Sequence, residues 1–218
     1  DLLVRREAVS DIQSTLASLG YRAIGIAADK HIGHWVRRYR AELPLVADVA
    51  GVGQLLVELH WALVEAPYYV DRITPADLWQ GMSPVTDLPH FLIPRPPVLL
   101  AHACAHLAVH HSRDLRLIWL VDIDRLASST AMDWNEVLRI AEEWKLGHAI
   151  HTGLTVTSRW LGTVTPSHAA PVLAQLASDP ISAGSWGIGD ETKDRTWRRA
   201  LNTLAILHPT QALHYAAW

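Results

Sequence analysis

The sequence predicts an α+β protein in which a small mixed sheet with helices is followed by a C-terminal helical bundle. The first third of the chain combines short apolar runs of strand length with one helical stretch, whereas the chain after residue 97 has helical periodicity. Between these parts, residues 67–96 are rich in proline and have no clear period. We therefore expect an α/β core over residues 1–66, a connecting segment over 67–96 and a helical domain over 97–218.

The predicted core opens with a strand, a helix and a second strand. Residues 2–4 form a short apolar run, and residues 5–19 carry aliphatic side chains at helical spacing. Gly20 follows this stretch, where a helix end favours a left-handed residue. Residues 21–27 then have a β-like pattern. Strand, helix and strand in this order predict a mixed α/β unit.

A hairpin is predicted next, with strands at residues 45–49 and 54–63. Glycines at positions 51 and 53 supply the positive φ that tight turns need. In the second strand, alternation places Glu58 and His60 on one face. Trp61 belongs to the opposite face, which we interpret as core.

The later segments are predicted from periodicity and from helix end signals. The connecting segment is expected to hold one short helix, near residues 76–79. Asp114 is a candidate N-cap, Asp133 with Glu136 resembles a capping box, and Gly147 is expected to end a helix. The helices expected in the helical domain are residues 98–111, 115–127, 137–145, 148–161, 171–177 and 190–207.

Composition narrows the classes of partner. The net charge is -3 and the basic residues are scattered, so duplex nucleic acid is not expected as a partner. Arg37, Arg38 and Arg40 form a short cluster that we interpret as solvated surface rather than a phosphate site.

No apolar run approaches the length of a membrane-spanning helix, which is about 20 residues, and no signal peptide is visible. The single Cys104 excludes an intramolecular disulfide and fits a cytoplasmic location.

Two carboxylates are candidates for metal-dependent chemistry. Nucleotidyl transfer needs carboxylates that hold divalent ions beside the phosphates, and hard oxygen ligands suit Mg²⁺. Asp1 precedes the first predicted strand, and Glu58 lies in the second strand of the hairpin. Taken alone, each is more typical of a solvated surface residue, so their chemical role depends on the wider pattern.

Four blocks of sequence, in order and at matching spacing, supply that pattern. They are Asp-Leu-Leu-Val at 1–4, Val-Glu-Leu-His-Trp at 57–61, the segment from His102 to His106 followed by Arg-Leu-Ile-Trp-Leu-Val-Asp at 116–122, and Asp-Trp at 133–134. Over about residues 1–165 the chain resembles a family of uncharacterised nucleotidyltransferases in the DNA polymerase β superfamily. Members carry Asp-x-Asp-Leu-Leu-Val after a Gly-Ser turn.

The resemblance implies roles for the two carboxylates. Asp1 corresponds to the second of the paired metal-binding carboxylates. Glu58 corresponds to the third, which binds metal and acts as base toward the acceptor hydroxyl. The first carboxylate would lie two residues before Asp1 and the Gly-Ser turn further upstream, so we expect this chain to lack part of the active site. The implied cofactor is Mg²⁺ or Mn²⁺.

The substrate-binding residues are expected to be His60, His102 and Asp122. His60 shares the face of Glu58, and His102 forms a helical stripe with His106 and His110. This stripe is also explained by hydrogen-bonded core histidines or, less readily, by a zinc site. Asp122 interrupts an apolar run, so we expect it to be buried and either paired or in contact with substrate. Asp124 is expected to face solvent.

Together these observations predict a metal-dependent nucleotidyltransferase. It would move a nucleoside monophosphate from an NTP to a hydroxyl of an unidentified acceptor, whether a small molecule, a peptide or a protein. The alternative is a non-catalytic, nucleotidyltransferase-like binding or scaffold module. A third hypothesis is a metallohydrolase whose metal ion is bound by histidines of the helical half. Nothing in the sequence indicates a nucleobase or an oligomeric state.

Overall fold

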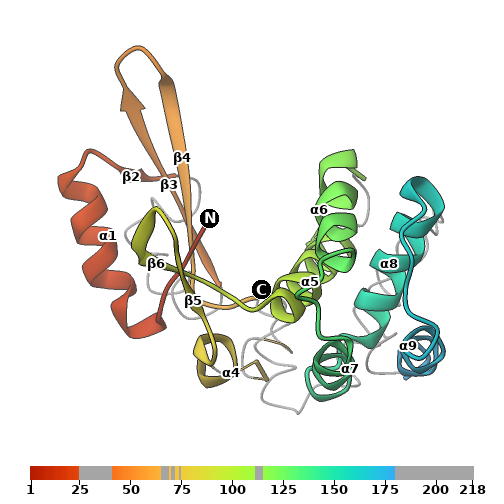
Figure 1. Ribbon diagram of the computed structural model, residues 1–218. Helices are drawn as coiled ribbons and strands as arrows, with labels where there is room; N and C mark the ends of the chain where they lie inside the picture. The colour runs from red at the N-terminus through yellow and green to blue at the C-terminus, as the bar shows by residue number, and fades with distance from the viewer. Residues whose placement is uncertain (25–40, 65–68, 70–71, 74, 111–114, 180–218) are drawn as a thin grey trace, which may run out of the picture. The chain divides into compact units, whose positions relative to one another are not determined.

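The computed structural model describes residues 1–24, 41–64, 69, 72–73, 75–110 and 115–179 (Figure 1). The described chain forms two compact units, which meet in sequence between Pro75 and Ala76. The first holds a mixed sheet and the second is mainly helical, which confirms the predicted α+β class. The predicted helix at 190–207, the basic cluster at 37–40 and residues 25–27 of a predicted strand lie outside the described residues.

The sheet of the first unit has four strands in the order β1-β4-β3-β2. Strands β3 and β4 pair antiparallel through their whole length, β2 pairs antiparallel with β3, and β1 pairs parallel with β4. The parallel pair brings the start of the chain beside the end of the hairpin. The strands are β1 (Leu2–Leu3), β2 (Arg22–Ala23), β3 (Glu42–Val49) and β4 (Gly53–His60).

One face of this sheet is covered by α1 (Val9–Ser18), which follows the 3₁₀ turn η1 (Arg6–Ala8). Gly20 ends the helical segment with a φ of 90°, as predicted. The opposite sheet face carries Glu58 and His60 together with the apolar Val46 and Leu56, whereas the core consists of alternate side chains of the strands and the inner stripe of the helix. Its buried members are Val9, Leu43, Leu45, Leu59 and Trp61.

The hairpin turns where the sequence predicts. Gly51 and Gly53 have φ values of 78° and 95°, in the region that favours glycine. The first strand, however, begins at Glu42 and not at residue 45, although Pro44 lies inside it. The carbonyl of Pro44 accepts a hydrogen bond from the amide of Ile24 at 3.2 Å, so the missing N–H of proline does not end the strand.

The second unit begins with a short helix and a hairpin. Helix α4 (Pro75–Trp79) agrees with the helix predicted near residue 76. The antiparallel pair β5 (Ser83–Val85) and β6 (Leu88–Ile93) was not predicted, because the prolines at 84 and 89 obscure its alternation. The connecting segment thus contains regular structure that the sequence pattern did not reveal.

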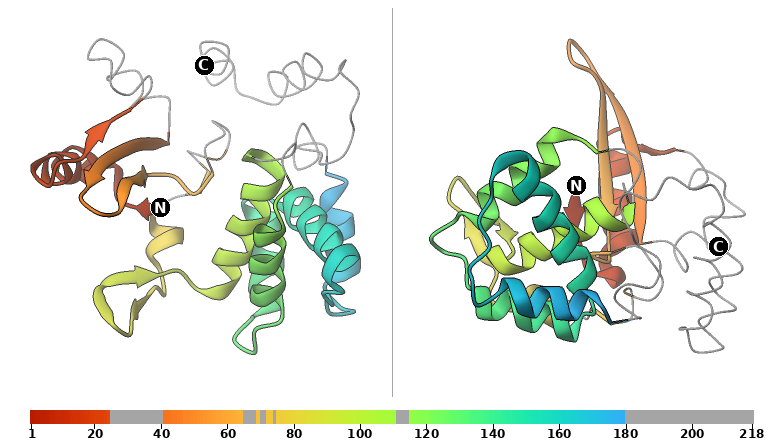
Figure 2. Two further views of the ribbon diagram at one scale, coloured as in Figure 1. Left: turned by 90° about the horizontal axis from the view of Figure 1, so that it is seen from above. Right: turned by 90° about the vertical axis from the view of Figure 1, so that its right-hand side faces the viewer.

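Five α-helices and a π-helical turn make up the rest of the described second unit. Helix α5 packs against α6, α7 and α8, and α8 packs against α9 (Figure 2). Gly153 of α8 lies directly against Cys104 of α5, which is fully buried. The elements are α5 (Pro96–Ala105), η3 (His106–His110), α6 (Leu117–Ala127), α7 (Trp134–Glu143), α8 (Gly147–Leu161) and α9 (Ala170–Ala177).

Two predicted helix ends differ from the structure. Helix α6 has Arg116 as its N-cap and not Asp114, which lies outside the described residues. The turn after α7 uses Lys145, with a φ of 58°, as its left-handed residue. Gly147 begins α8 instead of ending α7, and a side chain at this position would meet Leu176 of α9 at 2.6 Å.

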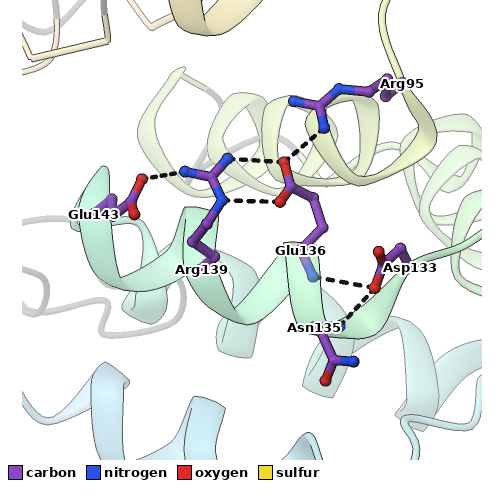
Figure 3. A network of polar contacts seen from close by, with 6 residues as sticks. All are labelled: Arg95, Asp133, Asn135, Glu136, Arg139 and Glu143. Carbon is purple, nitrogen blue, oxygen red and sulfur yellow. Dashed lines mark hydrogen bonds and ion pairs between the residues drawn. The ribbon is translucent and has the colours of Figure 1, made fainter. Parts of the chain in front are cut away.

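The predicted capping box at α7 is half formed. The Asp133 carboxylate accepts hydrogen bonds from the amides of Asn135 and Glu136, at 3.0 and 3.2 Å (Figure 3). The Glu136 side chain does not return to Asp133; it pairs with Arg95 and Arg139. Two guanidinium groups offer a carboxylate stronger, charge-assisted hydrogen bonds than one backbone amide does.

No helix in the described part of the chain combines the length and the apolar character needed to cross a membrane.

Candidate active site

The parallel pairing of β1 with β4 places Asp1 beside Glu58. Leu2 is paired with Leu59 and Leu3 with His60, and the amide of Val4 donates to the carbonyl of His60 at 2.8 Å. Side chains in register on neighbouring strands share a face. Asp1 and Glu58 therefore project from adjoining strands on the side of the sheet opposite the apolar core.

Asp1, Glu58 and His60 form a cluster of possible metal ligands. One ligand atom from each side chain lies within 4.8 Å of the other two. Asp1 is exposed, whereas Glu58 and His60 are half-buried. Within the described residues this is the one group of three or more histidine, cysteine or carboxylate side chains with such spacing. The structure thus brings together three of the five predicted site residues.

His60 has an unusual environment within this cluster. Its Nε2 atom is buried and has no hydrogen-bond partner, and Oε2 of Glu58 lies 3.8 Å away. Burial lowers the pKa of His60 below its usual value, and the charges of Glu42 and Glu58 oppose this effect without cancelling it. The neutral imidazole, which has a lone pair to offer a cation, is therefore favoured.

A further carboxylate, Glu42, belongs to the same sheet face and was missed in the sequence. It is paired directly with His60 across the β3–β4 ladder. Counting back equal numbers of residues from the glycine turn leads to this pair, so the register contained the signal. The strand predicted from residue 45 did not extend to Glu42, so this carboxylate was not among the predicted site residues. The sheet face opposite the apolar core, called the site face below, thus carries the carboxylates of Asp1, Glu42 and Glu58 and the imidazole of His60.

The other two predicted residues belong to the second unit. His102 of α5 is half-buried, and its ring centroid lies 6.0 Å from that of His106. His106 in turn makes an edge contact with Trp119 of α6 at 5.3 Å, and Arg116 stacks over the same indole at 5.3 Å. The two histidines are thus members of an aromatic cluster that joins two helices; the side chain of His110 lies outside the described residues.

The expected burial of Asp122 is wrong. Asp122 is exposed on α6, whereas Asp124, expected to face solvent, is half-buried and accepts a hydrogen bond of 2.6 Å from the hydroxyl of Thr163. The difference is set by the segment that follows α8, because Thr163 covers Asp124 but not the position two residues earlier.

Cys104 and Trp61 behave as structural residues, as predicted. Cys104 has no exposed surface, and burial raises the pKa of its thiol, which disfavours the reactive thiolate. Trp61 is 8% exposed and packs in the core behind the sheet. Neither side chain contributes chemistry to the site face.

A small mixed sheet that presents converging carboxylates defines the class as a nucleotidyltransferase-like α+β protein. The model of a family described as uncharacterised nucleotidyltransferase matches residues 1–162, and the chain belongs to this family. The match agrees with the resemblance to the DNA polymerase β superfamily. No curated protein and no solved structure matches the chain. Membership of this family indicates nucleotidyl transfer as the general activity.

Proposed function

We propose that the protein is a metal-dependent nucleotidyltransferase that moves a nucleoside monophosphate from an NTP to a hydroxyl of an acceptor. One observation carries this proposal: Asp1 and Glu58 converge from adjoining strands, with His60 beside them and ligand atoms within 4.8 Å. Carboxylates in this arrangement suit a divalent ion such as Mg²⁺ or Mn²⁺.

The side chains present fit such an ion. Two carboxylates supply oxygen ligands, and the buried, unpartnered Nε2 of His60 marks a place where a further group is wanted. When bound, the ion would neutralise charge on the phosphates and make the acceptor hydroxyl easier to deprotonate. Asp1 and Glu58 are the residues we assign to hold it.

The protein side chains have distinct roles in this proposal. Glu58 accepts the proton of the attacking hydroxyl, since an ionised carboxylate beside the reacting group can act as general base. His60 contacts the bound nucleotide from the same sheet face. His102 and Asp122 belong to the helical unit, and their part in substrate binding stays a prediction from the sequence.

The proposal is tested by label transfer from α-³²P-labelled NTPs in the presence of Mg²⁺ or Mn²⁺. Glu58→Gln keeps the shape of the side chain and removes its charge, so transfer should fall by about a thousandfold, as expected for the loss of several kcal/mol of transition-state stabilisation. Glu7→Gln is the matched control, because Glu7 is an exposed carboxylate in η1 of the same unit. Transfer that persists unchanged in Glu58→Gln would remove this residue from the mechanism.

A further inference from the structure

The imidazole of His60 points to a ligand beyond the two carboxylates. Its side chain is 22% exposed, and the Nε2 atom itself is buried without a hydrogen-bond partner. Glu58 is too far away, at 3.8 Å, to satisfy it. Buried polar atoms are rarely left unpaired in proteins, so this nitrogen indicates a group that binds there.

A metal ion fits the spacing of the three side chains. Their ligand atoms lie within 4.8 Å of one another. Two atoms that bind one ion at about 2.1 Å lie at most about 4.2 Å apart. Asp1 is exposed and Glu58 half-buried, so binding of one ion would need these two side chains to rotate toward His60.

The chemistry of the donors determines which ion is favoured. Mg²⁺ prefers oxygen ligands throughout, whereas an imidazole nitrogen increases affinity for first-row transition metal ions. We propose that Nε2 of His60 binds the same divalent ion as Asp1 and Glu58, and that this nitrogen makes the site select a transition metal ion over Mg²⁺. This inference rests on the proposed function, which places the ion at the two carboxylates.

Glu42 has a supporting role in this assignment. It lies opposite His60 in the β3–β4 ladder, and its negative charge acts on the imidazole. A carboxylate beside a ligating histidine is a common means of orienting the ring and increasing its basicity. Glu42 is therefore a positioning residue, and Glu42→Gln should weaken transition metal binding about tenfold.

The first experiment detects the nitrogen directly. Mn²⁺ is added to the whole chain, and electron spin-echo modulation is recorded for protein made with ordinary histidine and with ¹⁵N-labelled histidine. A directly bound imidazole gives ¹⁴N modulation, which the label replaces with that of ¹⁵N. Bound Mn²⁺ without any histidine nitrogen coupling would overturn the proposal, and this result does not depend on whether a variant folds.

The second experiment measures selectivity by calorimetric titration with Co²⁺ and Mg²⁺. His60→Gln should reduce Co²⁺ affinity by about tenfold to a hundredfold and leave Mg²⁺ affinity nearly unchanged. His90→Gln is the control, because His90 is an exposed histidine in β6 of the other unit. Equal Co²⁺ affinity in the parent chain and in His60→Gln would contradict the assignment.

The two proposals can fail separately. Label transfer that continues while Mn²⁺ shows no nitrogen coupling removes His60 as a ligand and leaves the transferase assignment in place. Nitrogen coupling without any label transfer from NTPs supports the ligand assignment and counts against the reaction. Loss of binding of both metals in Glu58→Gln would support a shared ion.

Discussion

Glu136 in the second unit and Glu58 in the first differ in how their charge is balanced. In the second unit, Glu136 accepts hydrogen bonds of 2.8 Å from both Arg95 and Arg139, and Arg139 also pairs with Glu143 (Figure 3). In the first unit, Glu58 has only the 3.8 Å contact with His60 among the ion pairs of the described residues, and Asp1 lies close by. Charges that are neutralised within the fold stabilise it, whereas converging charges that are left without cations are typical of binding sites.

Metal addition should stabilise the first unit and not the second, and this is the largest difference that we expect between them. Mn²⁺ at about 100 times its Kd is expected to stabilise the first unit by about 2.7 kcal/mol, because it binds only the folded site. Hydrogen exchange should slow in the amides of β4 and remain unchanged in those of α7. In Glu58→Gln the effect should disappear. A similar slowing in both units would contradict a metal site confined to Asp1, Glu58 and His60.

A packing change should destabilise only the helical unit. Gly147→Ala introduces a Cβ 2.6 Å from the Leu176 Cβ and 2.9 Å from its backbone carbonyl carbon, so α8 and α9 must separate. Overpacking of this kind should cost about 2 kcal/mol of unfolding free energy, measured by urea denaturation. Thr155→Ala, on the exposed side of α8, is the control and should be nearly neutral. An unchanged midpoint for Gly147→Ala would show that the helices can adjust without cost.

Breaking the charge network should have a smaller effect. Glu136→Gln removes the carboxylate that holds Arg95 and Arg139, and we expect a loss of about 1.5 kcal/mol. Arg139 is 41% exposed, so solvent screening keeps the loss modest. The variant should retain label transfer, whereas Glu58→Gln should lose most of it. Lost transfer with unchanged stability would break the contrast between the two units.

The same network predicts a pH dependence. Hydrogen bonding to Arg139 holds the pKa of Glu136 below its usual value, against an opposing effect of burial. A carboxyl with a lowered pKa in the folded state contributes stability above the unfolded value of about 4.3, and this contribution is lost as pH falls through the lowered pKa. The melting temperature should therefore fall less steeply in Glu136→Gln than in the parent chain as the pH is lowered from neutral to acid.

The helix cap should have the smallest effect. Asp133→Ala removes an acceptor for the amides of Asn135 and Glu136 and should cost about 1 kcal/mol. Asp133→Ser keeps a capping oxygen and should retain most of the stability. Thermal unfolding of the two variants gives the comparison, and equal melting temperatures for Ala and Ser would show that the cap is unimportant here.

Much of the fold was predictable from local patterns. Glycines 20, 51 and 162 take the left-handed conformation where a helix end or a turn was expected, because only glycine adopts it at little cost. The alternation around Glu58 correctly separated the site face from the core residues Leu59 and Trp61. These features depend on a few neighbouring residues, so the sequence carries them directly.

The rest required contacts between distant segments. Pairing of residues 2–3 with 59–60 brings Asp1 to Glu58, and the ladder from the turn brings Glu42 to His60. Proline hid the first residues of β3 and the β5–β6 hairpin, since a strand that contains it keeps its pairing only where the missing N–H is not needed.

The sequence by itself determined the α+β class, the turns at Gly20 and Gly51, and the face on which Glu58 and His60 stand. Tertiary structure decided which carboxylates meet at that face, and which of Asp122 and Asp124 is covered. The physical reason is the distance along the chain between the residues that interact. Backbone conformation and alternation follow from adjacent residues, whereas burial and the approach of charges depend on which segments pack together.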